Sequence, residues 1–387
     1  MAQRFEYRKP ESEAELQQLG RILTQCFNAP SMMESAFLNR IGIDNARVLF
    51  DRSQMIGGLG LLHLGQWYNG ASVPMVGISG VGIAPEHRGK GAAIALMQHA
   101  LSELHDQEIP ISVLYPATQT LYRKAGYEQA GIRCTWEIST AAIQAKTKAL
   151  SLSLTPLAID SFSSMYLQQA RSINGNLDRN DVIWKNLLDA QDKALYAYQI
   201  GTNEGYVIFE TWNDGENVNI AIRDWALLTP NAIDQFWAFF SQHRSQIETI
   251  RWKSAPIDAL TLSLPEQTAQ VRSLDRWMLR MVDLKAAIEQ RSYPTSVSAE
   301  LQFEVQDDWF PRNTGKFILT VENGAGQLTQ GGRGDLQMGI RDLSPLYTGL
   351  FTVRQLQQCG KLTGTDAALN IAEQLFLGSP VWMPDFF

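Results

Sequence analysis

The sequence has few of the features that mark a disulfide-stabilised, metal-binding or membrane-spanning protein. Its 387 residues include only three cysteines, Cys26, Cys134 and Cys359. Three widely spaced cysteines form neither a disulfide framework nor a Cys/His zinc pattern. No run of about 18 apolar residues predicts a transmembrane helix, and the first residues lack the apolar core of a secretory signal. We therefore expect a soluble, cytoplasmic protein with no metal ion and no membrane partner.

Long basic stretches are also missing. The chain has 33 Lys and Arg against 40 Asp and Glu, a net charge of −7, and no run of Lys and Arg longer than two residues. A protein that follows nucleic-acid phosphates needs a basic stripe, so no nucleic-acid partner is expected. An amine or another cation suits an acidic protein better. The hydrophobic share of 45% and the charged share of 19% are typical of globular proteins, and the length predicts two or three domains.

The first 140 residues alternate between helical and extended patterns. Leucines at helical spacing follow a Ser-x-x-Glu capping signal at Ser12 and Glu15, which predicts a helix over 13–27. Two extended runs, 55–64 and 73–83, flank an Asn-Gly pair and predict an antiparallel hairpin. The remaining patterns predict a helix over 92–104, a strand over 109–114 and a short helix over 121–126.

From about 145 to 285 the same alternation returns more weakly, which we interpret as a degenerate internal duplication. The glycine-rich turn that follows the first hairpin is replaced there by residues 223–230. A Tyr-Pro-Thr-Ser linker then leads to a third, smaller α+β unit, so three domains are predicted: 1–145, 146–287 and 288–387. The predicted strands are 194–200, 206–210, 218–222, 248–252, 301–305, 316–322 and 336–340, and the predicted helices are 231–243, 343–357 and 366–377.

The segment most informative about chemistry is the turn between the first hairpin and the next helix. Its sequence over 88–93, Arg-Gly-Lys-Gly-Ala-Ala, fits the pattern [R/Q]-x-x-G-x-[G/A]. Glycines let a backbone approach a ligand closely, and a helix beginning near Gly91 offers unpaired N–H groups and a positive dipole end. This arrangement suits a pyrophosphate, with Arg88 and Lys90 adding charge. Walker and dinucleotide glycine motifs fit less well; a glycine-rich turn without function is the alternative.

This turn resembles the coenzyme A loop of the GCN5-related N-acetyltransferases. Residues 121–127, Leu-Tyr-Arg-Lys-Ala-Gly-Tyr, are similar to their Y-x-x-x-G-[FY] signature. The W-x-x-R-x-x-D segment at 277–283 and the aromatic ending of the chain resemble the Eis (enhanced intracellular survival) family. The resemblance implies an α+β protein with tandem acetyltransferase domains, each a mixed sheet flanked by helices, followed by a sterol-carrier-protein-like domain. It also implies acetyl-CoA as co-substrate and a homo-hexamer.

The resemblance further implies that two parallel strands splay apart and that the pantetheine arm of the cofactor lies in the gap. An open strand edge can hydrogen-bond the amides of this arm as it would bind a peptide strand. The glycine-rich turn would then hold the pyrophosphate. The expected cofactor contacts are Val81, Gly82, Ile83, Arg88, Gly89, Lys90, Gly91, Ala92, Ala93, Ile94, Ala117 and Thr118.

Acetyl transfer from a thioester to an amine requires a base for the ammonium proton, donors for the oxyanion and an acid for the leaving thiolate. Tyr122 is the expected acid, because a phenol stays protonated at neutral pH; Tyr115 and Tyr127 are the alternates. No histidine or glutamate stands out as a base. The resemblance assigns that role to the terminal carboxylate, here that of Phe387. The aromatic ending itself suggests a docked terminus, since frayed tails are usually polar.

The leading hypothesis is direct transfer of acetyl from acetyl-CoA to an amine, either an aminoglycoside-like polyamine or lysine. A protein lysine is one alternative acceptor. A lipid or small-molecule carrier with a vestigial acetyltransferase half is the alternative from another functional class. The acceptor is expected near Phe27, Met33 and Phe37. Asp385 and Phe386 complete its site, although some relatives carry an acidic residue where this chain has Phe386.

Overall fold

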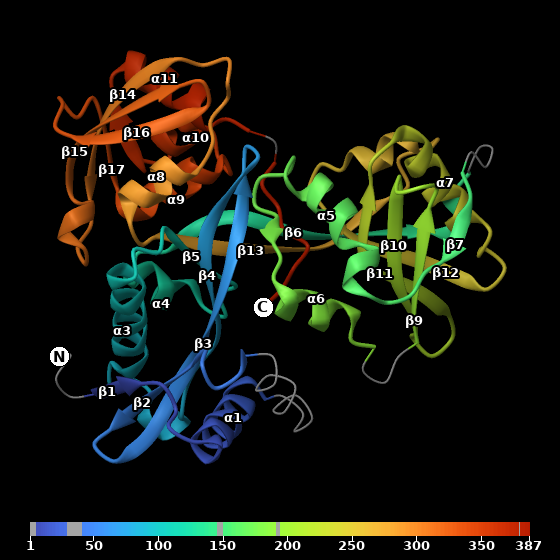
Figure 1. Ribbon diagram of the computed structural model, residues 1–387, viewed down its shortest axis with the longest axis horizontal. Coiled ribbons are helices and arrows are strands. Elements are labelled where there is room, and N and C mark those ends of the chain that lie inside the picture. The colour runs from blue at the N-terminus through green and yellow to red at the C-terminus, as the bar shows by residue number, and fades with distance from the viewer. Residues whose placement is uncertain (1–4, 29–40, 145–149, 191–193, 379) are drawn as a thin grey trace.

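The computed structural model describes residues 5–28, 41–144, 150–190, 194–378 and 380–387. Within these ranges the chain forms a mixed sheet of thirteen strands and a separate sheet of five, flanked by helices, which confirms the expected α+β class. In Figure 1 the first unit (blue to teal) lies below the third (orange to red), and the second (green to yellow) lies beside them. No described helix combines the length and apolar composition needed to cross a bilayer.

The first unit is built on the predicted hairpin. Strands β3 and β4 pair antiparallel along almost their whole length. The turn residues Asn69 and Gly70 both have positive φ, 47° and 87°, as a two-residue hairpin turn requires. The strands of this unit are β1 (Phe5–Arg8), β2 (Ala46–Asp51), β3 (Gln54–Tyr68), β4 (Ala71–Ile83) and β5 (Ile111–Leu114), and its helices are α1 (Glu13–Phe27), α3 (Ala92–Asp106) and α4 (Gln119–Lys124).

Helix α1 starts where the sequence predicts, but only half of the capping box forms. The Ser12 side chain accepts a hydrogen bond from the Glu15 N–H at 3.3 Å. The Glu15 carboxylate turns instead to the Arg8 guanidinium at 2.7 Å and to the Glu11 N–H at 2.8 Å. A charged partner within reach thus replaces the weaker bond to the Ser12 backbone.

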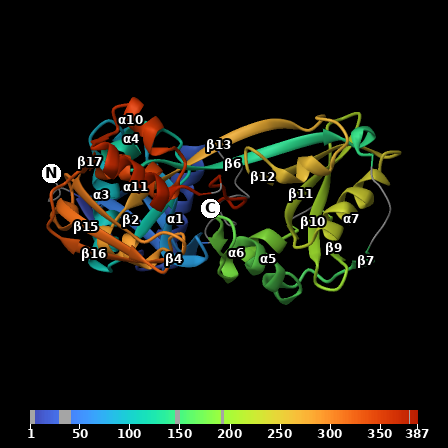
Figure 2. The same cartoon turned by 90° about the horizontal axis from the view of Figure 1, so that it is seen from above.

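Two long strands join the first and second units. They are β6 (Glu128–Ser139) and β13 (Gln270–Met281), and they pair with each other while β13 also pairs with β5 and β6 with β12. The last strand of the second unit therefore completes the sheet of the first, as Figure 2 shows. The sequence patterns predict neither strand. For β13 the reason is plain: its first seven residues are all exposed and carry no alternating apolar signal.

The second unit repeats the order of the first without its glycine-rich turn. Residues 223–230, expected to form a turn, are mostly strand: β11 runs to Leu227 and α7 begins at Pro230. Thr229 caps α7 through a bond from the Ala232 N–H, so strand and helix are joined almost directly. The elements are β7 (Leu152–Leu154), α5 (Ser163–Ala170), β8 (Leu177–Asp178), α6 (Asp181–Leu188), β9 (Leu195–Ile200), β10 (Gly205–Asn213), β11 (Val218–Leu227), α7 (Pro230–Ser241) and β12 (Ile247–Ser254).

The third unit is the five-stranded sheet covered by short helices. The helix expected over 343–357 is in fact two helices, because Gly349 adopts φ +73° and ends the first one. The elements are α8 (Leu284–Gln290), β14 (Ala299–Gln306), β15 (Gly315–Glu322), β16 (Ala325–Gln330), β17 (Leu336–Gly339), α9 (Ile340–Thr348), α10 (Val353–Gln358), β18 (Leu362–Gly364) and α11 (Asp366–Phe376).

The W-x-x-R-x-x-D segment forms the junction between the first and third units. The Trp277 ring fills the space that a side chain at position 131 would need, so only glycine fits there. The Arg280 guanidinium, fully buried, donates to both carboxylate oxygens of Asp307 at 2.7 Å. Asp283 caps α8 by accepting from the Ala286 N–H at 2.8 Å. Arg280 and Asp283 therefore fix this junction, whereas Trp277 packs within the large sheet.

Candidate active site

The site is built at the place where strands β4 and β5 part. They pair in parallel at only three positions, from Met75↔Ile111 to Gly77↔Val113. Strand β4 then continues to Ile83, and no described strand pairs with that stretch of its edge. One extra residue bulges β4 against β3, next to Gly80 with φ +63°, and such a bulge bends a strand away from its neighbours. The expected residues Val81, Gly82 and Ile83 therefore lie on an open edge.

The glycine-rich turn follows this edge directly. Gly89 and Gly91 have φ of +74° and +84°, and nothing lies within 4 Å of where a Cβ would stand on either. Helix α3 begins at Ala92 without a side-chain cap, and its first backbone bond runs from the Ala95 N–H to the Gly91 carbonyl at 3.1 Å. The preceding N–H groups of the helix, at 92–94, therefore have no acceptor within it.

The basic side chains of the turn are held by its own backbone. Arg88 Nε donates to the Ile83 carbonyl at 3.0 Å, which ties the turn to the end of the open strand. Lys90 Nζ donates to the Glu86 carbonyl at 3.0 Å. On the other side of the gap, Ala117 and Thr118 are exposed beyond the end of β5, where Thr118 precedes α4. The expected contacts thus flank one gap from both strands.

The two faces of the sheet at this gap carry different groups. Val76 and Ile78 of β4 belong to the buried cluster that contains α3 and Tyr122. On the opposite face, a Cβ at Gly77 would stand 2.5 Å from the Phe387 ring, so this ring lies against bare backbone. Helix α1 covers Gly82 on the same face as the Phe387 ring, through Leu23 and Cys26. The end of α1 and the end of the chain therefore share one face, opposite Tyr122.

Hydrogen bonding distinguishes the three candidate tyrosines. The Tyr115 hydroxyl donates to the Asp385 carbonyl at 2.8 Å, and the Tyr127 hydroxyl lies 2.7 Å from Ser112 Oγ. Among the residues that the structure describes, the Tyr122 hydroxyl has no hydrogen-bond partner. Burial raises the pKa of Tyr122 to about 12, so the phenol remains a proton donor at neutral pH. Of the three, Tyr122 alone has its hydroxyl uncommitted.

The chain ends in a docked tail, which we define as residues 381–387. Backbone bonds attach it to β6: the Met383 N–H donates to the Ile132 carbonyl at 3.0 Å, and the Ile132 N–H donates to the Val381 carbonyl at 3.2 Å. The Phe387 side chain is 4% exposed, whereas that of Phe386 is 57% exposed. The chain end lies between the first and second units, beside α6 (Figures 1 and 2).

The other expected acceptor residues are placed unequally. Phe27 ends α1 with a half-exposed ring, and Phe386 lies between the Tyr115 ring, 4.7 Å away, and the Arg133 guanidinium, 5.2 Å away. Met33 and Phe37 lie outside the described residues. Within the described residues, no three His, Cys, Asp or Glu side chains gather as a metal site would require.

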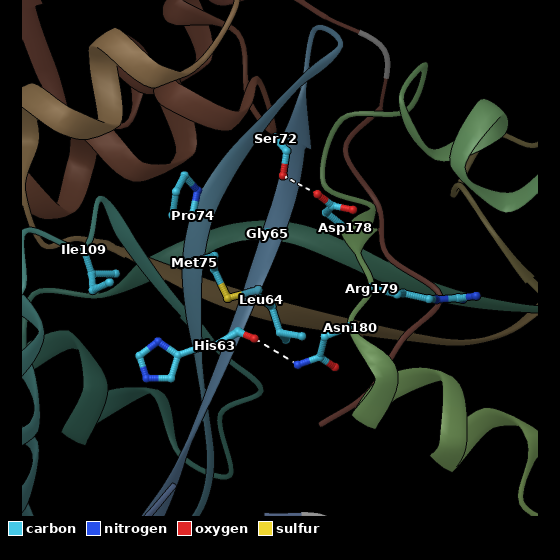
Figure 3. A pocket seen from close by; sticks show the side chains of 10 residues that line it. All are labelled: His63, Leu64, Gly65, Ser72, Pro74, Met75, Ile109, Asp178, Arg179 and Asn180. Atoms are coloured by element: carbon cyan, nitrogen blue, oxygen red, sulfur yellow. Dashed lines mark hydrogen bonds between the residues drawn. The ribbon is translucent and has the colours of Figure 1, made fainter. Parts of the chain in front are cut away.

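A cavity of about 450 Å³ lies elsewhere, between β3–β4 and the segment before α6 (Figure 3). Its part of β4, from Ser72 to Met75, precedes the residues at which the strands part. The His63 ring points away from Asp178 in Figure 3, and it belongs to the face opposite the Phe387 ring. We therefore do not assign this cavity to the chemistry at the gap.

The local sequence gives no signal for Arg179 and Asp224, the two residues of the second unit that form an ion-pair cluster with Asp385 of the tail. Arg179 binds the carboxylates of both Asp224 and Asp385, its partners lying 45 and 206 residues away along the chain. An isolated arginine followed by a distant aspartate has no recognisable spacing. Only the structure brings these three side chains together.

Three segments of the chain match known domain families. Residues 6–130 and 175–281 each match an acetyltransferase (GNAT) domain, and residues 284–384 match a sterol carrier protein domain. An uncharacterised N-acetyltransferase of Streptomyces griseus is 28% identical over 353 residues, covering 82% of this chain and 83% of the relative. The N-acetyltransferase Eis of Mycobacterium tuberculosis is 22% identical over 316 residues, covering 77% and 76%.

Solved structures resemble the chain over its full length. A GCN5-related N-acetyltransferase from Anabaena variabilis is 51% identical with a TM-score of 0.97, covering 99% of this chain and 100% of that one. Eis1 from Mycobacterium abscessus, at 20% identity and a TM-score of 0.85 over 99% and 100%, shares the fold. The tandem acetyltransferase and sterol-carrier architecture expected from the sequence is thus confirmed. The chain is an acyltransferase that belongs to the Eis-like family of the GCN5-related N-acetyltransferases.

Proposed function

We propose that this enzyme transfers the acetyl group of acetyl-CoA to a primary amine by direct attack, at the gap between β4 and β5. The observation that carries the proposal is the position of the last residue. The Phe387 ring lies on Gly77, the residue at which the two strands part. We propose that the carboxylate of this docked chain end serves the gap from one face, while Tyr122 lies on the other.

The cofactor would lie along the open edge of β4. Val81, Gly82 and Ile83 offer main-chain groups to the pantetheine amides. The turn at 88–91 and the first residues of α3 offer N–H groups to the pyrophosphate, where the helix dipole also favours negative charge. The open space around Gly89 and Gly91 supports this placement, because a phosphate needs close approach to the backbone.

Replacing Gly91 with valine tests the cradle. The new side chain enters the open space at the helix start and opposes the φ of +84°. We expect the Kd for acetyl-CoA, measured by calorimetry, to rise at least about tenfold, which corresponds to about 1.4 kcal/mol. Gly70→Val is the matched control, since Gly70 has φ +87° and equally open surroundings at the hairpin tip. An unchanged Kd in Gly91→Val, or an equal rise in both variants, would contradict the placement.

The two proton transfers follow from the two faces of the gap. The amine must lose a proton before it attacks the thioester carbon, and the Phe387 carboxylate is the proposed acceptor. A carboxylate shielded from water binds a proton more readily than an exposed one. The thiolate of coenzyme A then leaves and takes a proton from the Tyr122 hydroxyl. The nitrogen–carbon bond forms and the carbon–sulfur bond breaks. The nitrogen loses its second proton as it becomes an amide, and water carries that proton to the Tyr122 phenolate, while the Phe387 carboxyl releases its proton to solvent.

The Tyr122 role predicts a specific pH profile. Because burial raises the pKa of Tyr122 to about 12, the phenol keeps its proton through the range in which amines deprotonate. The rate should therefore rise with pH and show no fall from Tyr122 ionisation below about pH 11. Tyr122→Phe should lower kcat by about 10²–10⁴ without weakening acetyl-CoA binding, whereas Tyr127→Phe should keep most of kcat. Comparable loss in both variants would remove Tyr122 from the mechanism.

The base is tested by moving the terminal carboxylate. Adding two glycines after Phe387 shifts the carboxylate by up to about 7 Å, and we expect kcat to fall by about 100-fold with the Kd for acetyl-CoA unchanged. Gly77→Ala should act similarly, because the new methyl group displaces the Phe387 ring. Full turnover in the extended enzyme would exclude the carboxylate.

The acceptor is proposed to be an aminoglycoside-like polyamine. The net charge of −7 attracts cations, and exposed aromatic rings at Phe27 and Phe386, on the face that carries the tail, can contact ammonium groups. Free-thiol release from acetyl-CoA should depend on added aminoglycosides or aliphatic polyamines. Release with a lysine peptide alone would favour protein acetylation. No release and no heat on acetyl-CoA titration would favour a carrier function.

Two further expectations remain proposals. We keep the domain boundaries at 1–145, 146–287 and 288–387, with α8 spanning the last of them. Because β6 and β13 join the first two units in one thirteen-stranded sheet, these are structural rather than autonomous units. We also propose the homo-hexamer that the resemblance implies, to be checked by light scattering.

A further inference from the structure

The second unit has a gap of its own, equivalent to the one between β4 and β5. Strands β11 and β12 pair in parallel from Val218 to Ala221, and β11 then runs on to Leu227. One extra residue bulges β11 against β10 just before Asp224, as one extra residue bulges β4. Asp224 therefore stands on the strand edge that corresponds to the proposed pantetheine edge of the first unit.

The tail of the chain lies at this second gap. The Trp382 ring stacks on the Trp225 ring, with centroids 6.4 Å apart, and Pro384 lines the same small cavity as Asp224 and Lys253. Trp225 Nε1 donates to the Lys253 carbonyl at 3.0 Å and so closes the gap between β11 and β12. The second unit thus holds a segment of the chain beside its own gap.

A single guanidinium connects the gap to the tail. Arg179 Nη1 and Nη2 donate to the two Asp224 oxygens at 2.8 and 2.9 Å, and Nε donates to Asp385 Oδ1 at 3.0 Å. All three side chains are at most 4% exposed. The guanidinium also lies over the Tyr166 ring, 3.7 Å from its centroid. This arrangement fixes Asp385, two residues before the terminus, in direction as well as distance.

The charges make Arg179 indispensable to this arrangement. Without it, two buried carboxylates would face each other with no cation between them, which low-dielectric surroundings penalise heavily. Burial raises the pKa of the Asp385 carboxyl and the guanidinium opposes that rise. Lys253, whose pKa burial lowers to about 8, is a poor substitute for a permanent charge.

We propose that Arg179 is the positioning residue for the terminal carboxylate: the second unit has given up its cofactor gap and uses it to hold the base for the first unit. This rests on the proposed role of Phe387. In this proposal Arg179 contacts neither the reacting amine nor the thioester. It acts through Asp385, which lies two residues before the terminal carboxylate. A purely structural role, in which Arg179 only joins two units, is the alternative to be distinguished.

The experiment compares Arg179→Met, Arg179→Lys and Asp385→Asn in the full chain. Asp385→Asn keeps the shape of the tail and the Arg179–Asp224 pair, so it remains informative if Arg179→Met fails to fold. Arg251→Met is the matched control, because it breaks another ion pair between the second unit and the first, that with Glu137 of β6, a side chain with no hydrogen bond or ion pair to the tail among the described residues. Steady-state kcat, both KM values and the thermal midpoint are measured for each variant.

Docking of the tail is measured separately with a carboxypeptidase that prefers C-terminal aromatic residues. The buried Phe387 should resist release from the wild type and from Arg251→Met. In Arg179→Met and Asp385→Asn we expect rapid release of Phe387. We also expect kcat lowered by about 100-fold, KM for acetyl-CoA unchanged, and partial recovery in Arg179→Lys.

The outcomes separate this inference from the proposed function. A tail that stays protected with normal kcat in both Arg179→Met and Asp385→Asn overturns the inference and leaves the base in place. A released tail with normal kcat overturns the inference together with the role of the Phe387 carboxylate. If kcat falls only in proportion to the amount of folded protein, and Arg179→Lys recovers no activity, the role of Arg179 is purely structural. This outcome also overturns the inference.

Discussion

The parting of β4 and β5 is the constraint on which the rest of the site depends. Three parallel pairs hold the strands together, and the bulge near Gly80 then turns β4 away. Strand β5 cannot follow, because β13 holds it from its other side. The gap therefore exists before any ligand arrives. Its edge, the turn that follows and the two faces beside it all take their places from this single divergence.

The docked tail is held by contacts from all three folded units. A terminal carboxylate is attached to a flexible backbone, and ordering that backbone costs conformational entropy. The third unit supplies the tail, β6 of the first unit binds its main chain, and the second unit binds the Asp385 side chain. Burial of Trp382, Met383 and Phe387 offsets the cost of ordering. The end of the chain is thus held by several independent contacts.

Local sequence patterns predict the elements that flank the gap. Pairings between segments far apart in the chain leave no such pattern and are not predicted. Helix α1, the β3–β4 hairpin and the start of α3 follow from periodicity, an Asn-Gly turn and two glycines, all signals carried within a few residues. The aromatic ending indicated a docked terminus for the same reason. Strand β13 had no such signal, because its exposed half owes its structure to β6, well over a hundred residues earlier. The cluster around Arg179 is equally nonlocal.

The second unit keeps the strand geometry of the first without its glycine-rich turn. Its strands part after a bulge as those of the first unit do, so the gap is a property of the sheet rather than of the glycine-rich turn. Once β11 runs to Leu227 and Thr229 caps α7 at once, no free cradle of N–H groups remains there for a pyrophosphate. The open edge still requires a partner, since buried polar groups left unpaired are costly. Gln169 of α5 pairs with the Trp225 carbonyl and the Leu227 N–H on this edge, while Arg179 holds the Asp224 side chain and, through it, links the second unit to the tail.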